Sequence, residues 1–353
     1  MAQKRITFID TAKFFAIYFV IISHCRISTN ISHFLFAFHV PLFFILYGFV
    51  YKIRHNQRII NYLKEDMKSL VHRVLVPYFL LAFILGIPLS PKPFLFVCYG
   101  SIQSLSGITS THLWFLPCYF AAVVLYNLIC ISTKTSNWLR PFIFFILALV
   151  SAFLDSTNDF TIELKGYVLH LFGNNQSTGE NLYIGFPFAI NVAFSGVVFI
   201  YIGTLLRRLF DNLPWLLNKQ SVFIIFFVTF ILGCILFNLN NGDKYLIAMS
   251  LSQYGNYSLF IVTAIVLSVS TLMLAIIFDN SLFAKYGKYT LSIYAFHLAL
   301  VFVPSLLFKL LPFSIQNYPE IEAILYGSIV LFISCLLIPI IKRIDSNLIG
   351  EHK

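Results

Sequence analysis

Ten apolar segments constrain this chain more than any other feature, because most of them approach the roughly 20 residues that a helix needs to cross a bilayer. Charged residues make up only 11% of the chain, against roughly 25% in soluble domains. The segments predict an all-α fold, a polytopic membrane helix bundle whose core is the bundle interior. We place the ten transmembrane helices at about 6–25, 34–51, 72–90, 113–132, 139–154, 188–206, 220–238, 257–278, 288–311 and 321–342.

We expect one membrane-embedded domain over residues 1–353, with no appended soluble domain. The stretch 93–102 is apolar but short, and 244–256 is ambiguous. Either stretch could be re-entrant, so the number of helices could change by one or two. No cleavable signal peptide is expected at the start, because the first apolar segment lacks a small-residue cleavage site.

The distribution of basic residues predicts the orientation of the bundle. With the N-terminus in the cytoplasm, 18 of the 24 Lys and Arg residues fall in cytoplasmic segments and five in outer segments, with Lys13 inside the first helix. Basic residues are retained in cytoplasmic loops, so this asymmetry favours ten helices with both termini cytoplasmic. The net charge of +10 is therefore mostly a sign of topology and is no argument for nucleic-acid binding.

Three ionisable residues lie within the first apolar segment, namely Asp10, Lys13 and His24. At about 100° per residue, Lys13 and His24 fall within about 20° of one another, and Asp10 lies within about 60° of both. Such residues inside a membrane helix are costly and often functional. We interpret them as a polar track that leads to a chemically active His24. The alternative is that all three are interfacial residues, with Asp10 and Lys13 extending toward water.

Three more histidines and a tryptophan are candidates for substrate binding. His39 should return to a depth similar to that of His24, and His112 precedes Trp114 on the same outer side. His297 falls about ten residues into the ninth predicted helix. The competing interpretations are an interfacial His39, a Trp114 of the usual aromatic belt and a buried His297 bonded to a carbonyl.

Cytoplasmic arginines could bind a polyphosphate ligand such as coenzyme A, since guanidinium groups pair with phosphate oxygens. We single out Arg73, in the basic stretch 52–73, together with Arg207 and Arg208. Positive-inside anchoring and attraction to anionic lipids explain most of the same charge. On the outer side, the polar segment 155–187 suits a hydrophilic ligand such as a sugar, and equally suits a solvated loop.

Several short motifs occur in a characteristic order along nearly the whole chain. They are Asp10-x-x-Lys13 with His24, Phe38-His39-x-Pro41-Leu-Phe-Phe with Gly48-Phe49, Arg73 with Pro77-Tyr78, His112-Leu-Trp-Phe-Leu, and Ser292-Ile-Tyr294 with His297. This ordered set resembles the acyltransferase-3 family of bacterial membrane enzymes, and in particular its fucose 4-O-acetylase-like and O-antigen or capsule O-acetylase-like members. The chain departs from the usual pattern at Lys13, where Arg is frequent, and at Tyr47, where Ser is frequent.

The resemblance implies a multi-pass O-acyltransferase of the bacterial cytoplasmic (inner) membrane. It would use acetyl-CoA or another acyl-CoA as a cytoplasmic donor substrate, with no permanently bound cofactor. The acceptor would be a hydroxyl of a surface-polysaccharide sugar, free or lipid-linked. His24 would be central to transfer, as a general base or as a transient acyl carrier. No metal is implied, because the histidines lie on different predicted helices without a carboxylate at ligand spacing.

Two other function classes compete with this hypothesis. Polar residues in membrane helices also mark the substrate pathways of transporters and flippases, although the sequence shows no internal repeat. A non-catalytic membrane scaffold is the third possibility, and it leaves Lys13, His24 and His297 unexplained. Acyl-CoA hydrolysis or acceptor labelling by the purified protein would discriminate among them.

Overall fold

The computed structural model describes residues 7–25, 29–52, 58–84, 111–133, 136, 138–171, 186–309 and 318–344. These residues are predominantly helical and contain no β-strand; they hold an isolated bridge between Ala248 and Gln253. The chain folds as an all-α polytopic membrane bundle, as the sequence predicts. The candidate re-entrant stretch 93–102 lies outside the described residues.

Seven described helices are long and apolar enough to cross a membrane. They span Thr7–Cys25, Asn30–Val50, His112–Ser132, Pro187–Asn212, Lys219–Leu239, Tyr257–Ile277 and Pro319–Arg343. The remaining three predicted helices are shorter or divided. Residues 139–154 form the 15-residue helix α9 (Leu139–Phe153), and 288–311 divide into α15 (Thr290–Leu300) and α16 (Phe302–Lys309).

The helix predicted at 72–90 begins much earlier than expected. Helical backbone runs from Ile59 to Ile84, and residues 85–90 lie outside the described part of the chain. Two π-helical segments interrupt it, so it is made of α4 (Ile59–Asn61), η1 (Tyr62–Asp66), α5 (Met67–Leu70), η2 (Val71–Leu75) and α6 (Val76–Ile84). The basic stretch 52–73, which falls between two predicted helices, is therefore mostly helix in its described part, from Ile59 onward.

Pro41 accounts for a break in the second predicted helix. This segment consists of α2 (Asn30–Phe36) and α3 (His39–Val50). Pro41 has no N–H to donate to the carbonyl of Ala37, four residues earlier, and its ring crowds that carbonyl. The helix accordingly breaks at Ala37 and Phe38, and His39 is the first residue of the new helix.

The chain divides into two compact units. The first comprises Met1–Val50, Ile202–Ile247 and Gly255–Gly350, and the second comprises Tyr51–Tyr201, Ala248–Tyr254 and Glu351–Lys353. Helix α11 (Ile190–Asn212) runs from the second unit into the first. This division reflects which residues contact one another within the fold. The organisation of the chain as one acyltransferase domain stays a prediction.

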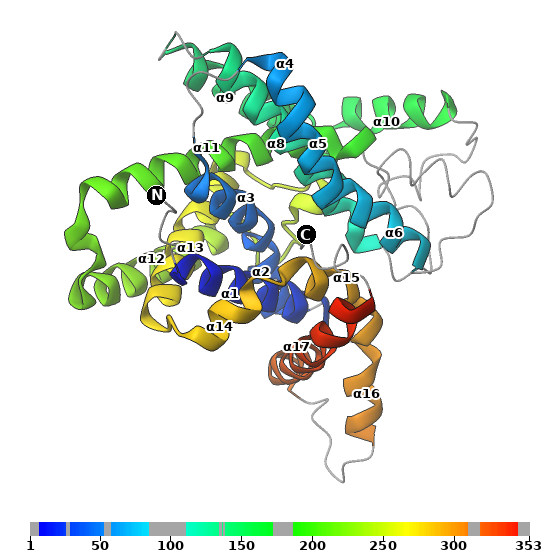
Figure 1. Ribbon diagram of the computed structural model, residues 1–353, viewed down its shortest axis with the longest axis vertical. Coiled ribbons are helices and arrows are strands. Elements are labelled where there is room, and N and C mark those ends of the chain that lie inside the picture. Colours follow the sequence, from blue (N-terminus) through cyan, green and yellow to red (C-terminus); the bar gives the residue numbers. More distant parts are fainter. Residues whose placement is uncertain are drawn as a thin grey trace. The chain divides into compact units, whose positions relative to one another are not determined.

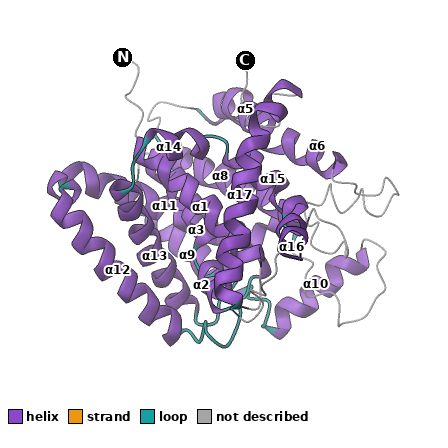
Figure 2. Cartoon of the chain, turned by 90° about the horizontal axis from the view of Figure 1, so that it is seen from below, coloured by secondary structure: helices purple, strands orange, loops and turns teal. Residues whose placement is uncertain are grey.

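Helix α1 (Thr7–Cys25) is central to the first unit (Figures 1 and 2). It packs against α2, α3, α13 (Tyr257–Ile277), α14 (Ser281–Gly287), α15 and α17 (Pro319–Ile344). Two glycines allow close backbone approach: Gly287 lies against the carbonyl of Asp10, and Gly327 lies against Ile22. Helix α1 is thus held by protein on most sides.

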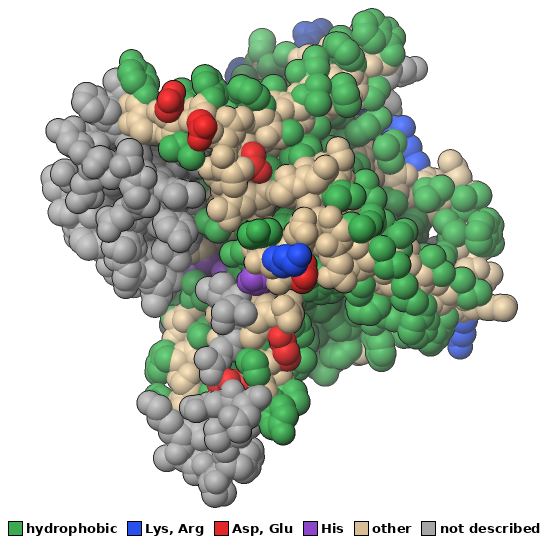
Figure 3. Space-filling view, turned by 180° about the vertical axis from the view of Figure 1, so that it is seen from behind, with side chains coloured by type: hydrophobic (Ala, Val, Ile, Leu, Met, Phe, Trp, Pro, Cys, Tyr) green, Lys and Arg blue, Asp and Glu red, His purple; other side chains and the backbone are tan. Residues whose placement is uncertain are grey.

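Helix α12 (Lys219–Leu239) packs along α13 and presents a broad apolar face away from it (Figure 2). The exposed side chains include Phe223, Ile224, Phe227, Val228 and Ile231. Exposed apolar residues on a helix of this length are expected to contact lipid chains. Figure 3 shows a similarly apolar surface over one face of the molecule, where hydrophobic side chains far outnumber charged ones.

The second unit is built around α8 (Phe115–Ser132), which packs against η2, against η6 (Pro187–Ala189) and against α9. The polar segment that the sequence places on the outer side contains a helix that we did not predict, α10 (Asp159–Leu171). Buried hydrogen bonds from Ser151 and Asn191 link α9, α11 and residue Ser252 at the end of η8 (Met249–Leu251).

Candidate active site

Asp10 and Lys13 form an ion pair on the first turns of α1. The Lys13 ammonium nitrogen lies 3.2 Å from an oxygen of the Asp10 carboxylate, and 31% of the Lys13 side chain is exposed against 5% for Asp10. The pairing follows from their spacing, because residues three apart on a helix are neighbours. A buried carboxylate is stabilised by such a partner.

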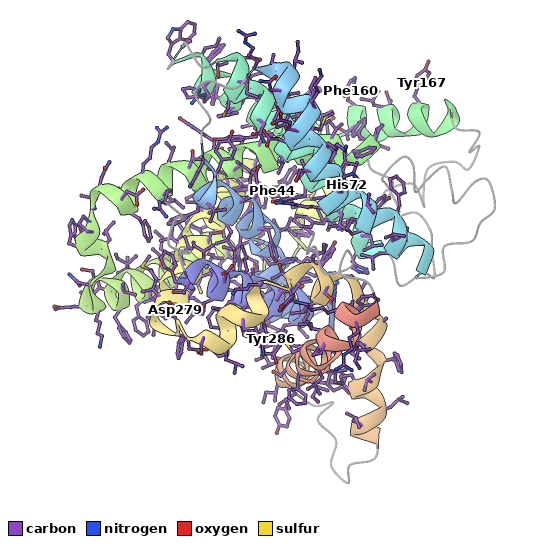
Figure 4. The ribbon with its side chains drawn as sticks, in the orientation of Figure 1. Phe44, His72, Phe160, Tyr167, Asp279 and Tyr286 are labelled. Carbon is purple, nitrogen blue, oxygen red and sulfur yellow. The ribbon has the colours of Figure 1, made fainter. Side chains whose placement is uncertain are left out.

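Helix α14 fixes the start of α1 against the bundle. The carboxylate of Asp279, just before α14, accepts hydrogen bonds from the hydroxyls of Thr7 (2.6 Å) and Thr11 (2.8 Å). Figure 4 labels Asp279 before α14 and Tyr286 near its end. The ring of Phe283 stacks on that of Phe14 with 4.7 Å between centroids. These contacts cover the same part of α1 that carries the Asp10–Lys13 pair.

His24 lies in the last turn of α1, half-buried beside two aromatic neighbours. Its ring centroid is 5.5 Å from that of His297 on α15, with the ring planes inclined by 41°. The ring of Phe36, at the end of α2, meets the His24 ring edge-on at 5.3 Å. Residues from three helices therefore meet around the His24 imidazole.

His39 and His297 are buried, and backbone carbonyls fix their tautomers, from α2 for His39 and from its own helix α15 for His297. Nδ1 of His39 lies 2.7 Å from the carbonyl oxygen of Leu35, and Nδ1 of His297 lies 2.7 Å from the carbonyl oxygen of Tyr294. A carbonyl oxygen only accepts, so Nδ1 carries the proton in both rings. In a neutral ring, Nε2 is then the hydrogen-bond acceptor.

The structure brings together three of the predicted histidines in the first unit. Phe36 contacts both His24 and His39, with 5.1 Å between the Phe36 and His39 centroids, and His297 contacts His24 directly. The Asp10–Lys13 pair is not part of this cluster. Lys13 is eleven residues from His24 on the same helix, about 16 Å along the axis.

The predicted coenzyme A ligands have different surroundings. Arg207 on α11 donates from Nε to Asp211 at 2.8 Å, and its guanidinium lies 5.5 Å from the ring centre of Phe49. Arg208 is exposed beside it. Arg73 is exposed on η2 and belongs to the second unit. The charge of Arg207 is thus partly balanced, whereas Arg73 and Arg208 extend to the surface.

His112 and Trp114 also belong to the second unit, on the short helix η4 (Thr111–Trp114) that precedes α8. Both are buried. Trp114 contacts Phe115, with 6.1 Å between ring centroids. The burial of Trp114 distinguishes it from an aromatic belt residue that faces the lipid headgroups.

Sequence reasoning missed three residues that shape the site: Asp279, Phe36 and Glu320. Glu320 accepts hydrogen bonds from the backbone N–H groups of Asn30 (2.9 Å) and Ile31 (3.0 Å), so it caps α2 from α17. A carboxylate at the edge of an apolar segment, as at 279 and 320, is a signal that could have drawn attention to both. Phe36 carries no such signal in an aromatic-rich segment.

Comparison with known proteins identifies the family of the chain. The acyltransferase-3 family model, described as an acyltransferase domain, matches residues 6–343. A search of curated proteins and a search of solved structures each returned no match. The match covers nearly the whole chain and includes both compact units described above. The chain therefore belongs to the acyltransferase-3 family of membrane acyltransferases.

Proposed function

We propose that this protein is an O-acyltransferase that moves an acetyl group from cytoplasmic acetyl-CoA to a sugar hydroxyl of a surface polysaccharide. The observation that carries the proposal is the half-buried His24 ring, 5.5 Å from the buried His297 ring, inside a chain of this family. Imidazole is the side chain best suited to moving protons near neutral pH. A sugar hydroxyl needs such a group, because it is a weak nucleophile while it keeps its proton.

In the proposed reaction, a ring nitrogen of His24 takes the proton from the sugar hydroxyl. The hydroxyl oxygen attacks the thioester carbonyl carbon, a C–O bond forms, and the C–S bond breaks. The coenzyme A sulfur leaves and takes the proton back from His24. His297, with its proton on Nδ1, can accept a hydrogen bond at Nε2 and so orient the His24 ring.

A covalent route is the alternative within the same function. His24 would attack the thioester itself and carry the acyl group, and the sugar hydroxyl would then take it in a second step. Rapid mixing of purified protein with labelled acetyl-CoA, without acceptor, separates the two routes. Label that stays on the protein after acid quenching favours the covalent route, and its absence in an enzyme that is active with acceptor favours the general base.

On the donor side, we propose that Arg73, Arg207 and Arg208 contribute to binding of the coenzyme A phosphates. The exposure of Arg73 and Arg208 supports this role, since guanidinium groups bind phosphate oxygens in pairs of hydrogen bonds. We propose that the acyl arm passes the Asp10–Lys13 pair on its way to His24. His39, His112, Trp114 and His297 are our proposed acceptor-side residues.

The membrane in this proposal is the bacterial inner membrane, and the acceptor is a carbohydrate, free or lipid-linked. The test compares surface polysaccharide from cells with the wild-type chain, with His24→Ala and without the gene, using proton NMR and mass spectrometry for ester groups. Membrane abundance of the variant is measured by immunoblot in parallel.

We expect ester in wild-type cells and none in the other two. Ester that persists with His24→Ala contradicts the role of His24. If ester is absent from all three, another acceptor or a transport function gains support. Hydrolysis of acetyl-CoA by the purified protein then decides between these two outcomes.

A further inference from the structure

Helix α10 presents an apolar stripe that no part of the acyl-transfer proposal uses. At about 100° per residue, Phe160, Leu164 and Tyr167 fall within about 60° of one another on one side of the helix. Phe160 and Tyr167 are 50% and 64% exposed. Figure 4 shows the labelled Phe160 and Tyr167 on the same edge of α10.

The adjoining helix α9 carries a lipid-facing stripe that leads directly to α10. Its exposed apolar side chains recur at helical spacing and are Phe142, Phe145, Ile146, Leu149, Val150 and Phe153. This period gives one continuous apolar face. In a membrane protein that face meets lipid chains.

Phe153 and Phe160 join the two stripes. Their ring centroids are 5.3 Å apart, and Phe153 is itself 55% exposed. The backbone carbonyl of Phe153 accepts hydrogen bonds from Asn158 (3.2 Å) and from the hydroxyl of Thr161 (3.3 Å). The first turn of α10 is thus tied to the end of α9, and its aromatic stripe continues the surface that lipid covers.

Charged side chains lie along one flank of this stripe, and Ile162, which is 40% exposed, lies on the far side of α10. Asp159 and Glu163 are exposed carboxylates, and nothing lies within 4 Å of the position where Gly166 would carry a side chain. Gly166 points about 100° away from Tyr167 around the helix. A helix with an aromatic stripe on one side and charge on another is suited to lie in the membrane–water interface.

We propose that α10 is a membrane-surface helix, lying at the bilayer interface beside the end of α9 with Phe160, Leu164 and Tyr167 in contact with lipid. Tyr is a favoured residue at this depth, because its ring is apolar and its hydroxyl reaches water. The proposed partner is the phospholipid surface itself. This inference does not depend on the proposed acyl-transfer chemistry.

Fluorescence quenching tests the proposal on the full-length protein in lipid nanodiscs. Tyr167→Trp adds an indole on the stripe, and Gly166→Trp adds one about 100° away from Tyr167, outside the stripe, as the matched control. The parent chain, with Trp114, Trp138 and Trp215, is measured in parallel so that the added emission is obtained by difference. The quenchers are phosphatidylcholine brominated on its acyl chains and water-soluble acrylamide.

We expect bromolipid to quench the emission added by Tyr167→Trp at least twofold more than that added by Gly166→Trp, and acrylamide to show the reverse order. Quenching of Tyr167→Trp by acrylamide alone would mean a solvated helix and overturns the proposal. Protection from both quenchers would mean that protein covers the stripe, which also overturns the proposal. Equal bromolipid quenching at both positions would mean immersion, contrary to a surface helix.

Discussion

Gly287, the last residue of α14, lies directly against the backbone carbonyl oxygen of Asp10 on α1, so that a Cβ at position 287 would collide with that oxygen. The contact brings α14 and α1 together at the residue that pairs with Lys13. A backbone oxygen within a packed helix cannot move aside for a new methyl group, as the end of a flexible side chain can. The spacing of the two helices is therefore set by the absence of a side chain at one position.

Gly287→Ala should lower both stability and activity. The added methyl group forces α14 away from α1, and overpacking of this kind costs about 1–3 kcal/mol. We expect a lower thermal midpoint in detergent and slower acyl transfer at saturating acyl-CoA. Gly166→Ala is the control, because position 166 has open space around it and Ala favours a helix over Gly by about 0.8–1.0 kcal/mol. Equal loss in both variants would contradict the argument from the α14–α1 contact.

The Asp10–Lys13 pair should behave as a coupled unit. Lys13→Met leaves the buried Asp10 carboxylate without the Lys13 charge, and Asp10→Asn removes the partner of Lys13. The double variant should be more stable than the sum of the single effects predicts, with a coupling energy of about 1–3 kcal/mol, between the values of exposed and buried pairs.

A double-mutant cycle of thermal unfolding in one detergent measures this coupling. Lys288→Met serves as control, since Lys288 is exposed just beyond α14. Strict additivity of Asp10→Asn and Lys13→Met would show that the pair contributes nothing to the fold.

His297→Ala should slow acyl transfer without weakening the binding of acetyl-CoA. The residue contacts the ring of His24, so its loss should reduce kcat by roughly 10–100-fold, less than the 10²–10⁴-fold expected for loss of the general base in His24→Ala. We expect KM for acetyl-CoA to change by less than about threefold. Steady-state assays in nanodiscs provide both constants.

His33→Ala is the matched histidine control for this series, because His33 lies on α2 and outside the cluster formed by His24, His39, His297 and Phe36. A His297→Ala enzyme with unchanged kcat would remove His297 from the mechanism. A rise in KM alone would assign it to binding.

Glu320→Ala should disturb the site through α2. It removes the acceptor for the N–H groups of Asn30 and Ile31, and loss of a helix cap costs about 0.5–2 kcal/mol. Since α2 ends at Phe36, which contacts His24 and His39, we expect kcat to fall together with the thermal midpoint. Glu320→Gln keeps one acceptor oxygen and should restore part of both. Failure of Gln to exceed Ala in either measurement argues against the cap.

The sequence predicted the parts of the fold that depend on local pattern. Apolar length identified α1, α8, α12, α13 and α17, and helical spacing placed Asp10 and Lys13 on one side of α1. The break at Ala37 and Phe38 follows from Pro41, but apolar length alone predicted one continuous helix over 34–51. The helix α10 was missed because the polarity of the segment around it hid the spacing of Phe160, Leu164 and Tyr167.

Contacts between helices could not be predicted in the same way. The neighbourhood of His24 and His297 depends on how α1 packs against α15, and no periodicity within either helix determines that packing. The capping of α2 by Glu320 joins residues 290 positions apart in the sequence. Close approach at Gly287 likewise requires the backbone of α1 to be in place first.

The exposed surface of α12 has a consequence for the membrane in which the enzyme is studied. Its 21 residues rise about 31 Å at 1.5 Å per residue, close to the roughly 30 Å hydrocarbon thickness of a typical bilayer. Since α13 covers one side of α12 and a broad apolar face of it is exposed, a thinner or thicker bilayer would leave a hydrophobic mismatch along this helix. Such a mismatch is relieved by tilting or by local deformation of the bilayer. Acyl-chain length is therefore a variable to hold constant whenever variants of this protein are compared.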